Sequence, residues 1–402
     1  MTLLSSTSAQ PLPGQETNAP SPPAGMWVDI ATDYSSLEKH RAAWDDLAVH
    51  AIEPNPFMES FLFLPSLKNY GAGKDFLFLL VYRTNPAANG TPMLCGFFPL
   101  WRRRTFKGLP VGCLQLWQYE HCLLSTPLIR RDQGPETWQS ILDWLATDPE
   151  SCPLIELPIF PAEGPVCQHL VDEIRRRSLL TFQSDCFTRP LLRRRESGEA
   201  YLQEALSSNR RRDYKRKEKR FAELGKLEYR SLESATDLSA WIDWFLQLEA
   251  SGWKGTEGTA LACSEASLSF FREATQTAFT QGQLRMLGLF LDEKPIAIRC
   301  NFISGRGSFF FKPGYDESFA KYSPGVLVEL QNIQEVHRDP RVWFMDSCTS
   351  PDNGLLNDLW LDRLLLQNLV LATGKGWGRL TVSTLPLFRW LRRLGRTPAA
   401  AE

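Results

Sequence analysis

The order of predicted strands and helices constrains the fold most, because the same order occurs in both halves of the chain. Apolar residues alternate in the strand segments and recur every three to four residues in the helical ones. In the second half, strands are predicted over 226–232, 284–291, 295–304, 307–312, 342–346 and 378–384, and helices over 237–250, 264–282, 324–337, 355–372 and 386–394. The first half has strands over 26–31, 75–83, 93–103, 111–120, 153–159 and 180–186, and helices over 35–50, 60–70, 135–146 and 164–178. A duplicated α/β (α+β) unit, with mixed and mostly antiparallel sheets flanked by helices, is the fold class that this order predicts.

Composition divides the chain into five segments. Residues 1–25 are rich in Pro, Ser, Ala and Thr with a single charge, Glu16, and are expected to be a disordered tail. Two domains are then predicted over 26–190 and 226–395, with a short tail at 396–402. Residues 191–225 should form a basic helical connector, because 12 Lys or Arg stand against 5 Asp or Glu from Arg189 to Arg220.

The overall composition argues against several classes of protein. A net charge of −1 gives no global attraction to nucleic acid. No apolar run approaches the roughly 18–20 residues of a membrane span. Nine cysteines without a C-x-x-C pair argue against a disulfide framework and a zinc site. We therefore expect a cytoplasmic protein with no metal and no nucleic-acid partner; the oligomeric state is open.

The turn before residues 324–337 predicts an anion site. The stretch Ser323-Pro324-Gly325 follows the aromatic strand GSFFFK and begins a helix. Ser323 is a suitable N-cap, Pro324 suits the first helical position, and Gly325 allows close approach to the backbone. Free amides and the helix dipole would then face an anion.

Longer strings resemble a known family. The strings SSNRRRDYKRKEKRFAELGKLEY, LEASGWKGTEGTAL, YDESFAKYSPGVLVEL and MDSCTSPDNGLLNDLW, with LWQYEHCLLSTPLI upstream, are similar to successive signatures of one GNAT branch. That branch is the family of acetyltransferases associated with cellulose and exopolysaccharide biosynthesis (CelD/BcsL type), distantly similar to FemAB-like transferases with a double-GNAT architecture. The resemblance covers roughly residues 27–395.

The resemblance implies a tandem GNAT fold and an acyl-CoA-dependent acyltransferase. The cosubstrate would be acetyl-CoA or another acyl-CoA. The acceptor would be a small molecule with an amine or hydroxyl, possibly a sugar or polysaccharide precursor, which attacks directly in a ternary complex. The matching cofactor positions are Phe310, Phe311 and Lys312 on the strand, and Lys321, Tyr322, Ser323, Pro324, Gly325 and Val326 at the turn.

The turn departs from the common GNAT loop, Gln/Arg-x-x-Gly-x-Gly/Ala, because it has one glycine and because Pro324 removes a donor. Lys321 could compensate as a point charge on phosphate. The corresponding stretch of the first half, residues 121–138, has a long loop and no glycine at the matching place. One cofactor site, in the second half, is therefore expected.

Three residues compete as the catalytic base: Glu249, Asp346 and His121. Glu249 could instead be a solvated carboxylate at a helix end, Asp346 the cap of a turn or helix, and His121 a satisfied loop histidine. Tyr322 could donate a proton or cover the pantetheine arm.

Two further side chains, Trp253 and Lys254, are expected to line the mouth of the acceptor site. A covalent mechanism through Cys348 is disfavoured because no supporting His pattern lies nearby in the sequence.

Three alternatives stay open at this point. One is a FemAB-like aminoacyl-tRNA-dependent transferase that uses the basic segment 210–220. Another is a non-catalytic GNAT scaffold in polysaccharide assembly, favoured by the single glycine of the turn. The third is nucleic-acid binding through the basic connector, which lacks interleaved aromatic residues for base stacking.

Overall fold

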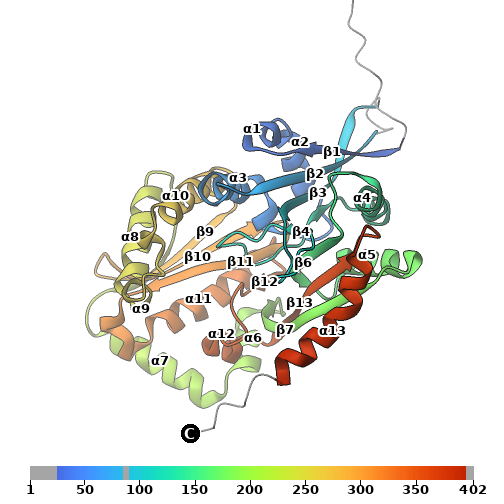
Figure 1. Ribbon diagram of the computed structural model, residues 1–402. Coiled ribbons are helices and arrows are strands. Elements are labelled where there is room, and N and C mark those ends of the chain that lie inside the picture. Colours follow the sequence, from blue (N-terminus) through green and yellow to red (C-terminus); the bar gives the residue numbers. More distant parts are fainter. Residues whose placement is uncertain (1–24, 85–89, 395–402) are drawn as a thin grey trace, which may run out of the picture.

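A computed structural model describes residues 25–84 and 90–394 (Figure 1). The predicted tails, 1–25 and 396–402, thus lie outside the described residues apart from Gly25. The strands are β1 (Met26–Ala31), β2 (Asp75–Thr84), β3 (Pro92–Arg103), β4 (Cys113–Leu116), β5 (Leu128–Ile129), β6 (Leu154–Pro161), β7 (Thr181–Arg193), β8 (Leu227–Ser231), β9 (Leu284–Leu291), β10 (Lys294–Ser304), β11 (Gly307–Tyr315), β12 (Phe344–Asp346) and β13 (Asp362–Ala372).

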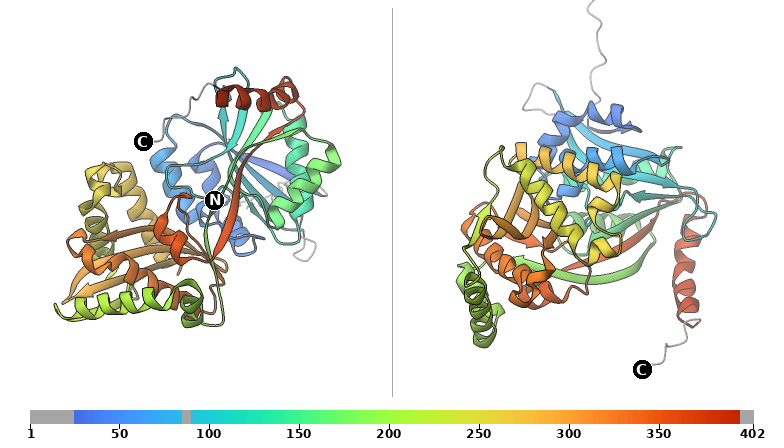
Figure 2. Two further views of the ribbon diagram at one scale, coloured as in Figure 1. Left: turned by 90° about the horizontal axis from the view of Figure 1, so that it is seen from below. Right: turned by 90° about the vertical axis from the view of Figure 1, so that its left-hand side faces the viewer.

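The helices cover both faces of these strands (Figures 1 and 2). They are α1 (Tyr34–Glu38), α2 (Arg41–Val49), α3 (Ser60–Tyr70), α4 (Gly134–Thr147), α5 (Pro165–Arg177), α6 (Gly198–Ala205), α7 (Ser208–Ala222), α8 (Leu238–Ser251), α9 (Trp253–Thr256), α10 (Glu265–Thr280), α11 (Pro324–Arg338), α12 (Gly354–Leu359) and α13 (Gly378–Leu394). Short 3-10 helices are η1 (Pro56–Met58), η3 (Leu261–Cys263) and η4 (Glu317–Tyr322). None of the helices within the described ranges combines the length and apolar character needed to cross a membrane.

In the described part of the chain, the strands form one 13-stranded sheet in the order β1-β2-β3-β4-β6-β13-β7-β12-β11-β10-β9-β8, with β5 paired to β3. Only the pairs β4–β6 and β11–β12 are parallel. The predicted class, a mixed and mostly antiparallel sheet flanked by helices, is confirmed. The two outer blocks, β1-β2-β3-β4-β6 and β8-β9-β10-β11-β12, repeat the same order and meet at β13 and β7.

The centre of the sheet exchanges strands between the halves. β13, from the end of the chain, lies between β6 and β7 of the first half. β7 pairs with β13 over Thr181–Leu191 and with β12 over Leu191–Arg193, so it runs without a break past residue 190. The division of the chain into the domains 26–190 and 226–395 stays a prediction.

Two element predictions near the end of the chain are wrong. The helix predicted over 355–372 ends at Leu359, and most of the remainder is β13. The strand predicted over 378–384 is the start of α13. Leucine-rich segments favour a helix in isolation, but residues 362–372 have strand neighbours on both sides, and tertiary pairing overrides the local preference.

Burial on both faces explains the apolar strands. Along β2, Phe76, Phe78 and Leu80 belong to a core shared with α2, α3, α8 and α10. The alternating residues Leu77 and Leu79 belong to a second core under α4 and α5. The first core crosses between the halves, because the ring of Phe61 on α3 lies 5.7 Å from that of Phe302 on β10.

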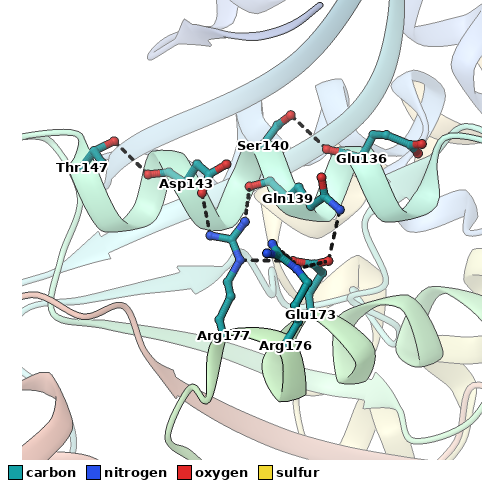
Figure 3. A network of polar contacts seen from close by, with 8 residues as sticks. All are labelled: Glu136, Gln139, Ser140, Asp143, Thr147, Glu173, Arg176 and Arg177. Atoms are coloured by element: carbon teal, nitrogen blue, oxygen red, sulfur yellow. Dashed lines mark hydrogen bonds and ion pairs between the residues drawn. The ribbon is translucent and has the colours of Figure 1, made fainter.

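Helices α4 and α5 of the first half are joined by a polar network (Figure 3). Glu173 accepts hydrogen bonds from Arg176 at 2.7 Å, from Arg177 at 3.1 Å and from Gln139 of α4 at 3.2 Å. Arg177 also reaches Asp143 of α4 at 2.6 Å. The hydrogen bonds from Arg176 lower the pKa of Glu173. This half is thus stabilised by contacts that involve no predicted site residue.

Candidate functional site

The turn before α11 differs from the predicted cap. Pro324 is the first helical residue, as predicted. Ser323, however, has a left-handed backbone (φ 57°, ψ 51°), and its side chain caps no amide of the helix, because a capping side chain needs an extended backbone. Its Oγ instead accepts a hydrogen bond from Nζ of Lys217 on α7, at 3.1 Å. The turn is therefore tied to the basic helix.

The turn offers fewer free amides than predicted. The N–H groups of Val326 and Leu327 both donate to the carbonyl of Ser323, at 3.0 and 3.1 Å. Pro324 has no N–H, and the N–H of Gly325 has no acceptor among the described residues. A Cβ added at Gly325 would lie 3.6 Å from the Tyr315 ring, an ordinary contact. One amide is therefore left to bind an anion, and further charge has to come from side chains.

A basic cavity beside the turn supplies that charge. It has a volume of about 380 Å³ and is lined by Arg216, Lys217, Arg220, Glu223 and Leu224 from α7 and its end, and by Lys321 and Tyr322 from η4. The ring of Phe221 stacks on Tyr322 at 4.7 Å with an interplanar angle of 2°, which anchors α7 there. Sequence reasoning placed these cations in a connector, although Phe221 on an otherwise polar helix marks the side that packs.

Strands β11 and β12 separate next to this turn. They pair only over Gly307–Phe309 and Phe344–Asp346, after which β11 continues to Tyr315 without its neighbour. A register shift against β10 leaves Phe311 as an extra residue on β11, a β-bulge. A cavity of about 90 Å³ lies between β11 and the start of α11; its lining includes Pro313, Gly314, Tyr315 and Gly325.

Neighbouring residues of β11 face opposite sides of the sheet. Phe310 lies on the α11 side, where the guanidinium of buried Arg299 stacks 3.9 Å from its ring centre. Phe311 lies on the side of α8 and α10, with its ring stacked 5.8 Å from that of Phe271. The bulge at Phe311 therefore separates the part of β11 near the turn from a second group of polar side chains.

In that second group, Glu249 holds Lys312. Oε1 of Glu249 pairs with Nζ of Lys312 at 2.9 Å, and Oε2 accepts the N–H of Leu261 at 2.9 Å. Glu249 is 2% exposed, so it is not a solvated carboxylate at a helix end. The pair keeps a positive charge next to the bulge and leaves Glu249 engaged at both oxygens.

His121 reaches the same place from the first half. Its ring stacks on Phe270 at 5.4 Å and meets the edge of Phe311 at 5.7 Å. Nε2 is buried and has no hydrogen-bond partner among the described residues, so His121 is not a satisfied loop histidine. Burial, and next the charge of Lys312, lower the pKa of His121 to about 3. The imidazole is therefore neutral near pH 7.

Asp346 is engaged in a buried ion pair. Its Oδ2 lies 2.5 Å from Nη2 of Arg189, and its Oδ1 accepts the N–H of Cys348 at 3.0 Å. Arg189 also donates to the carbonyl of Leu123 at 2.6 Å, so the pair fixes the loop that carries His121. Burial, and next the charge of Asp346, raise the pKa of the Cys348 thiol, which keeps it protonated.

The remaining predicted residues do not join this cluster. Tyr322 stacks on Phe221 and lies under Nζ of Lys321 at 4.9 Å, at the turn. Trp253 and Lys254 begin α9, but their side chains lie outside the described residues. Within the described ranges, no group of three or more His, Cys, Asp or Glu side chains could hold a metal ion.

The first half has a related helix start that is closed. Helix α4 begins at Gly134, which precedes Pro135, whereas Gly325 follows Pro324 at the start of α11. A Cβ at Gly134 would lie 2.0 Å from Nδ1 of His169, so the α5 side chain covers this helix end.

Comparisons with known proteins concern the second half and the overall fold. Residues 208–347 match a family model described as an acetyltransferase (GNAT) domain. Similar solved structures include FemX (8% identity, 82% of this chain, 95% of that chain, TM-score 0.53) and a conserved protein of unknown function from Bacteroides thetaiotaomicron (10%, 83%, 97%, 0.50). A tandem GNAT protein from the clavulanic acid biosynthesis pathway also matches (12%, 87%, 99%, 0.40). No curated protein matches the chain by sequence. Residues 208–347 are thus similar to a GNAT acetyltransferase domain, and the chain shares its overall fold with FemX.

Proposed function

We propose that the protein is an acyltransferase that moves an acetyl or other acyl group from coenzyme A to an amine or hydroxyl. One observation carries the proposal: β11 leaves β12 after Phe309 and joins two sites of complementary chemistry. An anion-binding turn lies beside Tyr315, and a neutral histidine lies beside Phe311. Four residues of strand separate them, roughly 13 Å, which suits an extended pantetheine arm.

In this proposal the coenzyme diphosphate binds at the turn. The N–H of Gly325 and the ammonium groups of Lys217 and Lys321 are its donors, and the dipole of α11 adds to their attraction. Val326 and Pro324 shape the start of the helix. The arm then follows β11 past Tyr315, and the thioester carbonyl binds backbone amides near the bulge at Phe310–Lys312.

The chemistry follows from the charges around Phe311. Neutral His121 accepts the proton of the attacking amine or hydroxyl through Nε2, and the new bond forms directly to the thioester carbon. Lys312, held by Glu249, stabilises negative charge on the carbonyl oxygen. When the intermediate collapses, the C–S bond breaks and the thiolate takes the proton that His121 accepted, which returns the imidazole to its neutral form. Asp346 acts as a positioning residue through Arg189, and Tyr322 covers the carrier at the turn.

The acceptor is proposed to be a sugar or a polysaccharide precursor. This class rests on the resemblance to the exopolysaccharide-associated family and not on a contact in the structure. Trp253 and Lys254 remain the proposed acceptor-side residues, since α9 directly follows Glu249 and α8.

Coenzyme binding and thiol release test this proposal. Acetyl-CoA should raise the melting temperature of the full chain by mass action, by an amount that grows with its concentration. A screen of amino and hydroxyl sugars should then find an acceptor that makes thiol release depend on His121. Absence of coenzyme binding, measured by calorimetry, would overturn the proposal.

An aminoacyl-tRNA-dependent transferase is the second candidate, favoured by the outer side of α7. Arg212, Lys215, Lys219 and Arg220 are exposed there and form no ion pair with any described residue. A tRNA carrier would bind with a steep salt dependence, because phosphate contacts release counterions. Competition binding of acetyl-CoA and aminoacyl-tRNA distinguishes the coenzyme-dependent enzyme from the tRNA-dependent one. A protein that binds neither carrier would be the non-catalytic scaffold.

A further inference from the structure

Helix α13 has two apolar sides: one is buried, and the other is not covered by any residue that the structure describes. Val382 and Leu385 are buried in a core with Phe106 and Val370. On other sides of the same helix and just before it, large apolar side chains are exposed: Trp377 (71%), Leu380 (55%), Leu387 (56%), Phe388 (45%) and Trp390 (56%). In Figures 1 and 2 no other element lies over the outer side of α13. Such a cluster on one helix indicates an interaction surface.

Two segments that border this surface carry charges of one sign. Residues 373–390 contain Lys375, Arg379 and Arg389 and no carboxylate. The loop 103–112 packs against α13 through Phe106, and it adds exposed Arg104 and Lys107, again without a carboxylate. Among the described residues, Arg104, Lys107 and Arg379 form no ion pair, whereas Arg389 donates to the carbonyl of Gln183 at 3.2 Å. The apolar side of α13 is therefore bordered by cations.

We propose that α13 binds the surface of an anionic phospholipid bilayer, lying in the plane of the headgroups. An interfacial helix inserts Trp, Phe and Leu to the headgroup boundary while Lys and Arg meet the lipid phosphates. The two tryptophans have the ring type that sits at that level, because indole is apolar with one polar N–H. This surface is separate from the acyl-transfer site and adds a location for the reaction rather than a step in it.

Charge complementarity favours the bilayer over a second copy of the chain. In a twofold dimer the same patch meets itself, so Arg379 and Arg389 would approach their own equivalents without a carboxylate between them. Anionic lipid headgroups supply the opposite charge. The buried residues Val382 and Leu385 hold the helix on the protein, so the exposed side chains are presented without unfolding.

Flotation of the full chain with vesicles tests the proposal. The protein should float with phosphatidylcholine vesicles that contain phosphatidylglycerol, and binding should weaken as salt screens the charges or when the vesicles are pure phosphatidylcholine. The double variant Leu380→Ser with Leu387→Ser should bind vesicles at least about tenfold more weakly, because the bilayer would no longer bury two aliphatic side chains. Trp343→Ser is the matched control: Trp343 is 54% exposed but stacks on Arg306, away from α13, and should float as the original chain does.

A charge variant separates the lipid from other partners. Arg379→Gln with Lys107→Gln should weaken binding to the anionic vesicles and reduce its salt dependence, while the melting temperature stays unchanged. Equal flotation of both double variants and the original chain would overturn the proposal. Failure to bind any vesicle would also overturn it. In that case, a dimer in sedimentation velocity that Leu380→Ser with Leu387→Ser dissociates would identify a second copy of the chain as the partner.

Discussion

The two halves carry the same parallel strand contact but continue it differently. In the first half, β4 pairs with β6 over Cys113–Gln115 and ends at Leu116, and the following loop turns away. In the second half, β11 pairs with β12 over three residues and then runs on to Tyr315. The difference decides which half has a strand that extends beyond its parallel contact.

The loop after β4 is fixed by hydrogen bonds within the first half. Asn55 holds this loop by donating to the carbonyls of Leu124 at 3.0 Å and Thr126 at 2.8 Å. Ser125 also donates to the carbonyl of Pro158 on β6. The loop then places His121 against Phe311 of the second half. The first half, whose β4 does not continue past its parallel contact, thus contributes His121, the proposed base.

The largest expected effect comes from removing that base. His121→Asn should lower kcat by roughly 10²–10⁴-fold, the usual contribution of a positioned base, with the melting temperature nearly unchanged. Because burial and Lys312 lower the pKa of His121 to about 3, the rate should show no inflection from this group between about pH 5 and 8. A histidine-like inflection near pH 6.5 that disappears in the variant would contradict the neutral-base assignment.

The second prediction concerns the acid that joins the halves. Glu59, before α3, accepts hydrogen bonds from Ser304 and from Gln283 of the second half, the latter at 2.6 Å. Burial raises its pKa to about 7 from its ordinary value of 4.5. The folded chain thus binds a proton that the unfolded chain releases, so the stabilising effect is full below about pH 4.5 and is lost as pH rises through 7.

Glu59→Gln should remove this pH dependence and stabilise the chain at pH 8 by on the order of 2–3 kcal/mol. Denaturant unfolding of both chains at pH 5 and pH 8 measures it. Burial also raises the pKa of Glu53, in the first half, to about 7. Glu53 is present in both chains, so it contributes the same pH dependence of stability to each. Equal pH slopes for the two chains would show that Glu59 is not the group.

The third prediction compares the two helix starts. Lys217→Ala with Lys321→Ala should weaken coenzyme binding by roughly ten- to a hundredfold, because charge-assisted hydrogen bonds are lost at the turn. Lys219→Ala, an exposed change on the same helix, is the control. His169→Ala uncovers the start of α4, yet it should create no second coenzyme site, because β4 ends at Leu116 and provides no extended strand for the pantetheine arm. Calorimetric stoichiometry checks both statements.

The smallest expected effect separates packing from binding at two glycines. A Cβ at Gly314 would lie 2.8 Å from the backbone nitrogen of Glu249, so Gly314→Ala should cost about 1–3 kcal/mol of unfolding free energy. At Gly325 the nearest atom would be 3.6 Å away, so Gly325→Ala should change the unfolding free energy by less than about 0.5 kcal/mol. The same variant should bind the coenzyme more weakly. Equal melting temperatures for the two variants would contradict the close approach of α8 to β11.

The sequence predicts local elements and the turn, but not what meets them across space. Pro324 at the start of α11 and the aromatic strand before it are local signals, and both are confirmed. The pairs Glu249–Lys312 and Asp346–Arg189 join residues 63 and 157 positions apart, which no spacing rule links. Residues 362–372 were misread for the same reason, since their neighbours β6 and β7 lie about two hundred residues earlier.

The position of β13 has a consequence for how this chain matures. When a ribosome has released the first 190 residues, β6 has an unpaired edge and β7 has no partner on either side. Such edges invite contacts with other chains. The nascent protein therefore has to shelter them until residues 362–372 emerge and close the gap. A chain truncated before residue 362 would therefore lack β13, and its first half would be left without the strand that pairs with β6 and β7.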